Sequence, residues 1–428
     1  MKTSIYYLLI IIIFAPAAVA QSKKDKIEIG VQSTSLTLFG PDFPGDVTHA
    51  GVGGRVTYNI NRSIAAEAEF NFFPQQHFIL SAEGRGIQGQ FGVKLGKRFE
   101  KFGIFAKVRP GFLSVGNVFS LQPGPLNLST FNTKLERRNF FTIDIGGVLE
   151  LYPSRRTVVR FEAGDTSLRH PDRFDVVFSE TPFVELSRPA KFKHNFQFTA
   201  GVGFRLGDFP DADDNLQTSN QQERTPRFEA GVQFTSLFVD PPSPVPQGVS
   251  ATFDDGRVHV EPGFGGRFTF NLTENIALEA EGNYYTRDLF NGPNPSGHIF
   301  QGQFGGKVGK RWSKWGLFGK VRPGFVAYSK VNELVSTRIV NVQFLNETIA
   351  VEIGEFRVAK KYYPSIDIGG VVEFYISPRW MARFDIGDTV IRYGEVAAQG
   401  FSLRNQVVRR PPETRHNLQV TSGIGFRF

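Results

Sequence analysis

The chain has 428 residues, of which 21% are charged and 40% hydrophobic, and its formal net charge is +8. Its 45 Gly and 25 Pro argue against a mostly helical protein, and the charged fraction is too low for a disordered chain. The sequence holds no Cys, which excludes disulfides, thiolate zinc sites and a cysteine nucleophile, and the modest charge makes nucleic-acid binding a poor expectation.

Residues 1–20 have the pattern of a secretory signal peptide. Lys2 precedes an apolar run over residues 5–14, and Ala18-Val19-Ala20 supplies the small residues of a cleavage site. We expect removal of this segment, so that Gln21 becomes the first residue. The alternative is an N-terminal membrane anchor, for which the apolar run is short.

The remainder consists of two copies of one unit. Residues 88–112 (QGQFGVKLGKRFEKFGIFAKVRPGF) and 301–325 (QGQFGGKVGKRWSKWGLFGKVRPGF) agree at 18 of 25 positions. Residues 143–166 match 366–389, and residues 194–205 match 416–427. A repeat this long predicts two domains, over 26–207 and 227–428. The polar residues 208–226 between them have the composition of a linker.

Each copy holds eight segments of about ten to fourteen residues in which apolar and polar residues alternate, as in β-strands. Within residues 88–99, for example, Phe91, Val93 and Leu95 share one face, whereas Lys94 and Arg98 share the other. A half-buried strand of a soluble protein alternates in the same way, so the connections must discriminate.

Short and long connections follow one another in turn. Short joints fall at residues 61–62, 100–101 and 153–156, and long loops at 40–48, 74–86, 117–138 and 170–193. The second copy has a further long loop over 332–361, a candidate binding surface. Short turns at one rim and long loops at the other are typical of a bacterial outer-membrane barrel, and an even strand count places both termini in the periplasm.

The chain ends Gly423-Ile424-Gly425-Phe426-Arg427-Phe428, an alternating strand that finishes on Phe. Through this strand and its architecture, the mature chain resembles two tandem copies of the small outer-membrane barrels typified by OmpA and OmpX. The resemblance implies an all-β protein of two transmembrane, antiparallel, up-and-down, eight-stranded barrels. It also implies that Phe426 and Phe428 signal to the barrel-assembly machinery, and that outer-membrane lipid and lipopolysaccharide surround the protein.

An apolar face turned to lipid explains the 44 Phe residues, and Trp312 and Trp315 suit an interfacial aromatic girdle. A soluble sandwich, which would bury this face, is the alternative. The opposite face is charged, with six acids and seven bases in each copy. In the first copy these are Glu28, Glu67, Glu69, Asp144, Glu150, Glu162, Arg55, Lys94, Arg98, Lys107, Arg109, Arg160 and Arg205. In the second they are Glu229, Glu279, Glu281, Asp367, Glu373, Asp385, Arg267, Lys307, Arg311, Lys320, Arg322, Arg383 and Arg427.

Near-neutrality within each copy is what a closed interior requires, because enclosed charges are costly unless they are paired. The side chains of an eight-stranded barrel just fill its interior. We therefore favour two narrow barrels with an interior charge network. One sixteen-stranded barrel with a water-filled pore remains the alternative.

Two local features depart from the strand pattern. Pro110 and Pro323 stand inside strands, where a missing N–H predicts a bulge or an early strand end. Asp165 and Asp388 fall on the lipid-facing register, which predicts a bulge at Gly164 and Gly387 or a place at the extracellular rim.

The sequence offers no catalytic, cofactor-binding or metal constellation: its seven His show no HxH or HExxH spacing. The leading hypothesis is a non-enzymatic, integral outer-membrane protein with a closed interior, whose long loops have a structural, adhesive or binding role. We expect no nucleic acid among its partners, and the sequence identifies no extracellular ligand. The alternatives are passive diffusion of small polar solutes and a rim-active enzyme on outer-membrane lipid.

Overall fold

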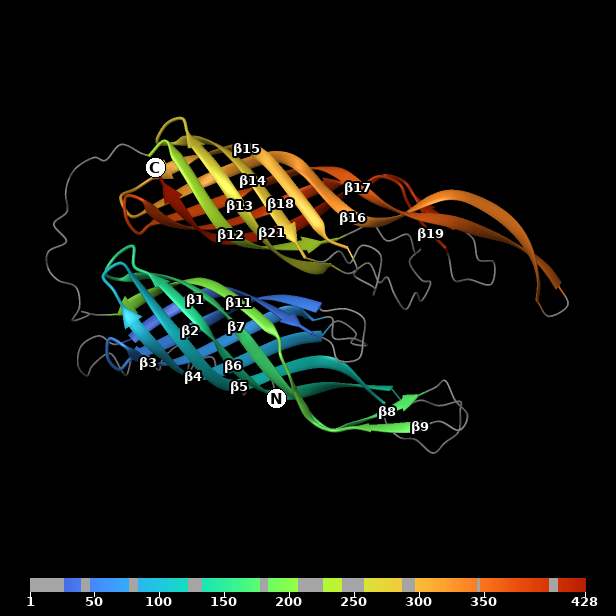
Figure 1. The fold of residues 1–428 in the computed structure, drawn as a ribbon, viewed down its shortest axis with the longest axis horizontal. Helices are drawn as coiled ribbons and strands as arrows, with labels where there is room; N and C mark the ends of the chain where they lie inside the picture. Colours follow the sequence, from blue (N-terminus) through green and yellow to red (C-terminus); the bar gives the residue numbers. More distant parts are fainter. Residues whose placement is uncertain are drawn as a thin grey trace, which may run out of the picture.

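The computed structural model describes residues 27–39, 47–76, 84–121, 133–177, 184–206, 226–240, 258–286, 297–344, 347–399 and 407–428. The expected signal peptide and residues 208–225 of the expected linker lie outside these ranges. The described chain folds into two antiparallel β-barrels, one in each repeat (Figure 1). None of its segments is a helix long and apolar enough to cross a membrane.

The first barrel consists of eight strands: β1 (Ile27–Leu38), β2 (Val47–Asn59), β3 (Ile64–Gln76), β4 (Gly84–Arg98), β5 (Phe102–Leu121), β6 (Thr133–Leu151), β7 (Thr157–His170) and β11 (Phe196–Leu206). The second consists of β12 (Phe228–Val239), β13 (His259–Asn271), β14 (Ile276–Tyr285), β15 (Ile299–Arg311), β16 (Trp315–Phe344), β17 (Glu347–Tyr375), β18 (Trp380–Arg392) and β21 (Thr414–Arg427). Five short strands lie outside the two rings: β8 (Arg173–Val177), β9 (Val184–Arg188), β10 (Lys191–Lys193), β19 (Val396–Gln399) and β20 (Val407–Arg410).

Each barrel closes on itself through its first and last strands. β1 pairs with β11 from Ile27↔Leu206 to Thr37↔Phe196, and β12 pairs with β21 from Glu229↔Arg427 to Leu237↔Gln419. Closure leaves no strand free to extend one ring into the other. The prediction of two tandem eight-stranded barrels is therefore confirmed, and the single sixteen-stranded barrel does not form.

The alternation of residues sets the two faces of each wall. On β15, Phe304 and Val308 are each 61% exposed on the outside, whereas Gln303 and Lys307 are buried on the inside. The register of neighbouring strands keeps this division around the barrel, because each inward residue pairs with another inward residue. The outcome is a wall with an apolar exterior and a polar, charged interior.

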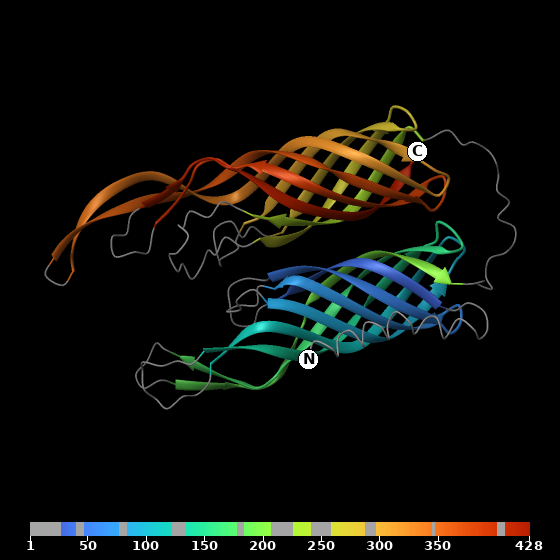
Figure 2. The ribbon, with the colours of Figure 1, turned by 180° about the vertical axis from the view of Figure 1, so that it is seen from behind.

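The loop predicted over residues 332–361 is in large part strand, and so are the described residues at both ends of the loop predicted over 117–138. β5 reaches Leu121 and β6 begins at Thr133, while β16 and β17 remain paired as far as Phe344↔Glu347. The pairing of β16 with β15 ends at Tyr328, so the rest of this hairpin projects beyond the barrel (Figures 1 and 2). Its alternation is obscured because charged residues occur on both faces, which explains why the sequence suggested a loop.

Neither predicted consequence of the strand prolines is observed. β5 continues through Pro110 and β16 through Pro323, and the pairs on either side of each Pro keep one register. Instead, two residue pairs are missing from each strand pairing beside the Pro. A Gly on the facing strand accommodates this gap. A Cβ built on Gly305 would lie 2.1 Å from the carbonyl oxygen of Val321. The missing side chain thus lets β16 approach β15 without a bulge.

We expect Gly305→Ala to destabilise the second barrel by roughly 1–3 kcal/mol, because backbone atoms must move to admit the methyl group. Gly306→Ala is the matched control, since its Cβ would meet nothing closer than 3.4 Å, and its effect should stay within about 0.5 kcal/mol. The free energy of unfolding can be followed by tryptophan fluorescence, because all three Trp residues belong to the second repeat. Equal effects of the two substitutions would contradict this account.

Candidate functional site: the barrel interiors and the long-loop rim

The charged residues predicted to face inward lie inside the barrels. Of the twenty residues proposed for the interior network, eighteen are buried: Glu67, Glu69, Lys94, Lys107, Arg109, Asp144, Glu150, Arg160 and Glu162 in the first barrel, and Glu279, Glu281, Lys307, Lys320, Arg322, Asp367, Glu373, Arg383 and Asp385 in the second. The other two, Arg98 and Arg311, are partly exposed near the tight-turn end. Glu28 and Arg55, from the wider inward set, are buried as well.

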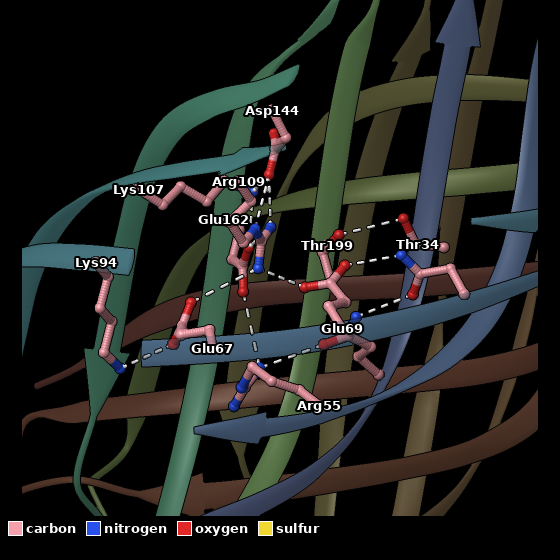
Figure 3. A network of polar contacts seen from close by, with 12 residues as sticks. Thr34, Arg55, Glu67, Glu69, Lys94, Lys107, Arg109, Asp144, Glu162 and Thr199 are labelled. Carbon is pink, nitrogen blue, oxygen red and sulfur yellow. Dashed lines mark hydrogen bonds and ion pairs between the residues drawn. The ribbon is translucent and has the colours of Figure 1, made fainter. Parts of the chain in front are cut away.

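Arg109 is the centre of the network in the first barrel (Figure 3). Its Nη1 lies 2.6 Å from Glu69 Oε2, and its Nη2 lies 2.7 Å from Asp144 Oδ2 and 2.8 Å from Glu162 Oε2. Lys107 Nζ approaches the same Asp144 and Glu162 oxygens at 2.8 Å. One guanidinium therefore connects carboxylates from three strands, β3, β6 and β7.

Further pairs extend the network to the other strands. Arg160 donates from both terminal nitrogens to Glu67, at 2.5 and 2.7 Å. Lys94 on β4 pairs with Glu150 and, at 3.3 Å, with Glu67. Arg55 Nη2 on β2 lies 2.9 Å from Glu28 Oε1 on β1. With Arg205 on β11, whose Nε lies 3.8 Å from Glu28 Oε2, the ion pairs involve all eight strands of the barrel.

The second barrel repeats this arrangement with Arg322 in place of Arg109. Arg322 pairs with Glu281, and its Nη2 lies 2.7 Å from Asp367 Oδ2. Arg383 pairs with Glu279 and places Nε 2.6 Å from Asp385 Oδ1. The same chemistry at equivalent positions in both copies shows that the network belongs to the repeat and does not depend on loop sequence.

A layer of amides lies beside the ions. Asn71 donates to Glu69 and Gln88, and Gln88 donates in turn to Gln197 at 2.9 Å. Asn283, Glu281, Gln301 and Gln419 form the equivalent chain in the second barrel. Gln90 and Gln303 differ, because neither end of either buried amide forms a hydrogen bond with any residue that the structure describes.

Apolar side chains close the interior toward the long-loop end. Leu36, Leu113 and Val115 belong to an inward-facing buried cluster in the first barrel. The second barrel has a larger one with several tyrosines, in which the Tyr328 and Tyr393 hydroxyl groups lie 3.0 Å apart. A solute would therefore meet an apolar obstruction as well as the ion network. The apolar clusters could have been predicted from the sequence, since their residues continue the inward-facing alternation of the strands. A search for charged residues alone does not find them.

The predicted set of inward-facing charges omits one residue. Glu261 on β13 is buried and occupies the position of the buried His49 in the first copy. It has the same strand parity as Arg267, so the alternation rule could have identified it, although the adjacent Pro262 obscured the pattern. With Glu261 included, the second barrel has seven interior acids.

Asp165 and Asp388 lie on the outer surface near the long-loop end, and the bulges predicted at Gly164 and Gly387 are absent. Gly164 pairs in register with Gly146 and Gln197, and Gly387 pairs equally regularly. Each aspartate instead faces a histidine: Asp165 faces His194, between β10 and β11, and Asp388 faces His416 on β21. The distances to Nδ1 of His194 and His416 are both 2.6 Å.

This pair does not form a nucleophile relay. Ser167 Oγ lies 3.2 Å from His194 Nδ1, the same nitrogen that Asp165 contacts, whereas a relay uses opposite nitrogens of the ring. Val390 occupies the position of Ser167 in the second copy. Among the described residues no group of three or more His, Asp or Glu is arranged to hold a metal ion.

The terminal residues close the second barrel at its tight-turn end. Phe428 and Phe228 exchange backbone hydrogen bonds of 2.8 and 3.0 Å, and their rings stack with centroids 5.8 Å apart. Phe426 contacts Trp380 edge to face, with 5.1 Å between centroids. These contacts give both proposed signal residues a structural role in the finished barrel, and an assembly role remains a prediction.

Comparisons with known proteins add little to this description. No family model matches the sequence, and a search of curated proteins finds no match. Three similar solved structures are the N-terminal β-barrel domain of Pseudomonas aeruginosa OprF, the attachment invasion locus protein Ail of Yersinia pestis, and a Pseudomonas aeruginosa FadL homologue. Each is 10% identical to this chain.

The first two matches cover 43% of this chain and 100% of the matched chain, with TM-scores of 0.24 and 0.27. The third covers 96% and 92%, with a TM-score of 0.27. Similarity at this level carries no argument about activity. The assignment of two eight-stranded barrels rests on the strand pairing itself.

We expect Arg322→Met to destabilise the second barrel by about 3–5 kcal/mol, because Glu281 would keep its buried charge without a cation and Asp367 would retain only Lys320. Arg322→Lys keeps the charge but loses the forked geometry, so its loss should be smaller. Arg357→Met is the control, since Arg357 is exposed in the hairpin and its solvent-screened ion pair should contribute little to stability. Guanidinium unfolding in lipid vesicles measures all three. A loss for Arg322→Met no larger than the control's would contradict a structural role for the network.

Proposed function

We propose that this protein is an integral outer-membrane β-barrel protein that does not conduct, and that it acts as a structural, adhesive or binding protein through the segments at its long-loop end. The termini and the tight turns would face the periplasm. The proposal rests on three features: the apolar exterior, the closed interiors and the hairpin that projects from the second barrel.

The exterior supports a lipid environment. Outward residues such as Val31, Phe91, Val232 and Phe304 are 45–72% exposed around both walls. In water this much apolar surface would be unfavourable, whereas in a bilayer it faces acyl chains. Trp312 and Trp315 stack with centroids 4.0 Å apart at a tight turn, where an aromatic girdle meets the headgroups.

The charge-paired interior is the observation on which the non-conducting function depends. Ion pairs cross each barrel from wall to wall, and an apolar cluster lies between them and the long-loop end. Opening such an interior to solute would break several buried ion pairs at once. In a protein whose barrels serve mainly as membrane anchors, the residues that other molecules can reach lie at the rim.

Among the described residues, the β16–β17 hairpin is the longest part of that rim. Beyond Tyr328 it bears exposed apolar residues, including Val335 and Ile339, next to charged ones. At its base Glu333 pairs with Arg357 and Lys361. Hydrogen bonds from Lys361 and then Arg357 lower the pKa of Glu333 to about 2. This ion pair therefore persists over the ordinary pH range.

Single-channel recording tests the closed interior. The mature chain, refolded and inserted into a planar lipid bilayer, should give no stable conductance steps, because both interiors are filled. Recovery of the chain in the outer-membrane fraction of cells tests its location separately. Large and stable open steps would overturn the proposed function and favour a diffusion channel.

A spin label tests the hairpin, and the absence of native Cys makes Ile339→Cys a unique attachment site. Because the pKa of Glu333 is depressed, its stabilising effect is present above the ordinary carboxyl pKa and is lost only as the pH falls toward about 2. Label mobility should thus stay constant from neutral pH to about pH 4, near the unperturbed value. Glu333→Gln should increase mobility at every pH, while Glu355→Gln, which replaces a carboxylate that accepts a hydrogen bond from Ser336, provides a control. A mobility change near the unperturbed carboxyl pKa would contradict the depressed pKa.

A further inference from the structure

The outer faces of the two barrels are in contact along one side. Leu151, Val159, Phe161, Ala200 and Ala382 form one buried cluster that contains residues of both repeats. All five occupy outward positions of their strands, where residues elsewhere on the walls are exposed. The barrels lie side by side with their tight turns at the same end, which is visible from both directions (Figures 1 and 2).

Equivalent residues of the two copies meet each other in this interface. Phe161 follows Arg160 on β7, and Phe384 follows the matching Arg383 on β18. Their rings are parallel within 3°, with centroids 6.0 Å apart. β2 and β13, which are also equivalent strands, lie next to each other. Contact between equivalent elements defines an isologous interface, the kind that two-fold symmetry produces.

The tilt of the strands explains why two different pairs of equivalent strands meet. Phe161 and Phe384 lie close to the tight turns that begin β7 and β18. On each tilted wall, different strands face the partner at different heights. Both contacts are therefore consistent with one approximate two-fold axis that runs along the barrels.

The symmetry is approximate because the two copies carry different residues at some positions of the interface. Phe198 on β11 stacks on Phe234 of β12, with centroids 4.1 Å apart and an interplanar angle of 27°. The symmetry-related positions hold Val420 and Ser33. One side of the interface thus has an aromatic pair, and the other has small residues.

We propose that the chain is a covalently linked pseudo-dimer whose two barrels associate in the membrane through this isologous face. The occupant of each face is the other repeat of the same chain. This inference rests on the proposed membrane location, since it concerns which surface is withheld from lipid. It adds that the two sets of long-loop segments are held together as one composite surface.

Packing supports association in a lipid environment. Apolar surfaces gain little from leaving acyl chains, so contact there depends on close van der Waals fit. Ala200 and Ala382, at most 2% exposed, keep the walls close, and the aromatic pairs supply larger contact areas. The far side lacks such fit: Phe91 and Phe304, themselves equivalent residues, are 45% and 61% exposed.

Cysteine cross-linking tests the proposal, because the chain has no native Cys. The full chain would carry Phe161→Cys and Phe384→Cys, together with a protease site inserted in residues 208–226. It would be treated in isolated outer membranes with a short bismaleimide and then cut. The two halves should remain joined in denaturing gels for most of the protein. Phe91→Cys with Phe304→Cys, on the far faces, is the matched control and should separate.

Separation of the halves in the interface variant, or equal cross-linking of the control, would overturn the pseudo-dimer. Cross-links between whole chains before cutting would overturn it as well, since they would assign the face to a second copy. The same reaction on protein refolded in lipid vesicles tests the interface independently of the cellular location. Failure of the chain to sediment with the outer membrane would count against the proposed function and not against the interface.

Discussion

The pairing of buried charge is the constraint on which the structure depends. A closed eight-stranded wall leaves no room for water to solvate its interior charges, so each cation must meet carboxylates with good geometry. Arg109 and Arg322 satisfy this by contacting carboxylates from several strands at once. Because these carboxylates lie far apart in sequence, the network forms only when the strand register is correct. The interior therefore specifies the closed barrel as well as filling it.

Much of this could be predicted from the sequence, because two simple periodicities determine it. The internal repeat divides the chain into two units, and the alternation within each strand assigns residues such as Lys94 and Glu150 to the inside. Which cation pairs with which carboxylate could not be predicted, since that depends on the register of strands and on side-chain reach. The choice between two barrels and one depended on which edges pair, and composition does not encode that directly.

The predictions that the structure contradicts also failed for reasons of strand pairing and of contacts between segments. The predicted loop over 332–361 is a hairpin because pairing between β16 and β17 continues without a buried face to impose alternation. Pro323 causes no bulge because Gly305, on the facing strand one position along, lets the backbones approach. Asp165 needs no bulge on the outer face because His194, just before β11, provides its partner. In each case the deciding contact comes from a neighbouring segment of the barrel.

In the proposed binding role, the long hairpin would also determine where an encounter with another molecule takes place. From Tyr328, where β15 ends its pairing, to Phe344, the ribbon extends roughly 50 Å at the usual rise per residue. That length exceeds the width of a small domain, about 30 Å. A molecule held at the tip would thus stand clear of the bilayer surface. The hairpin would act as a spacer, and shortening it would change the height of contact without altering the contact residues.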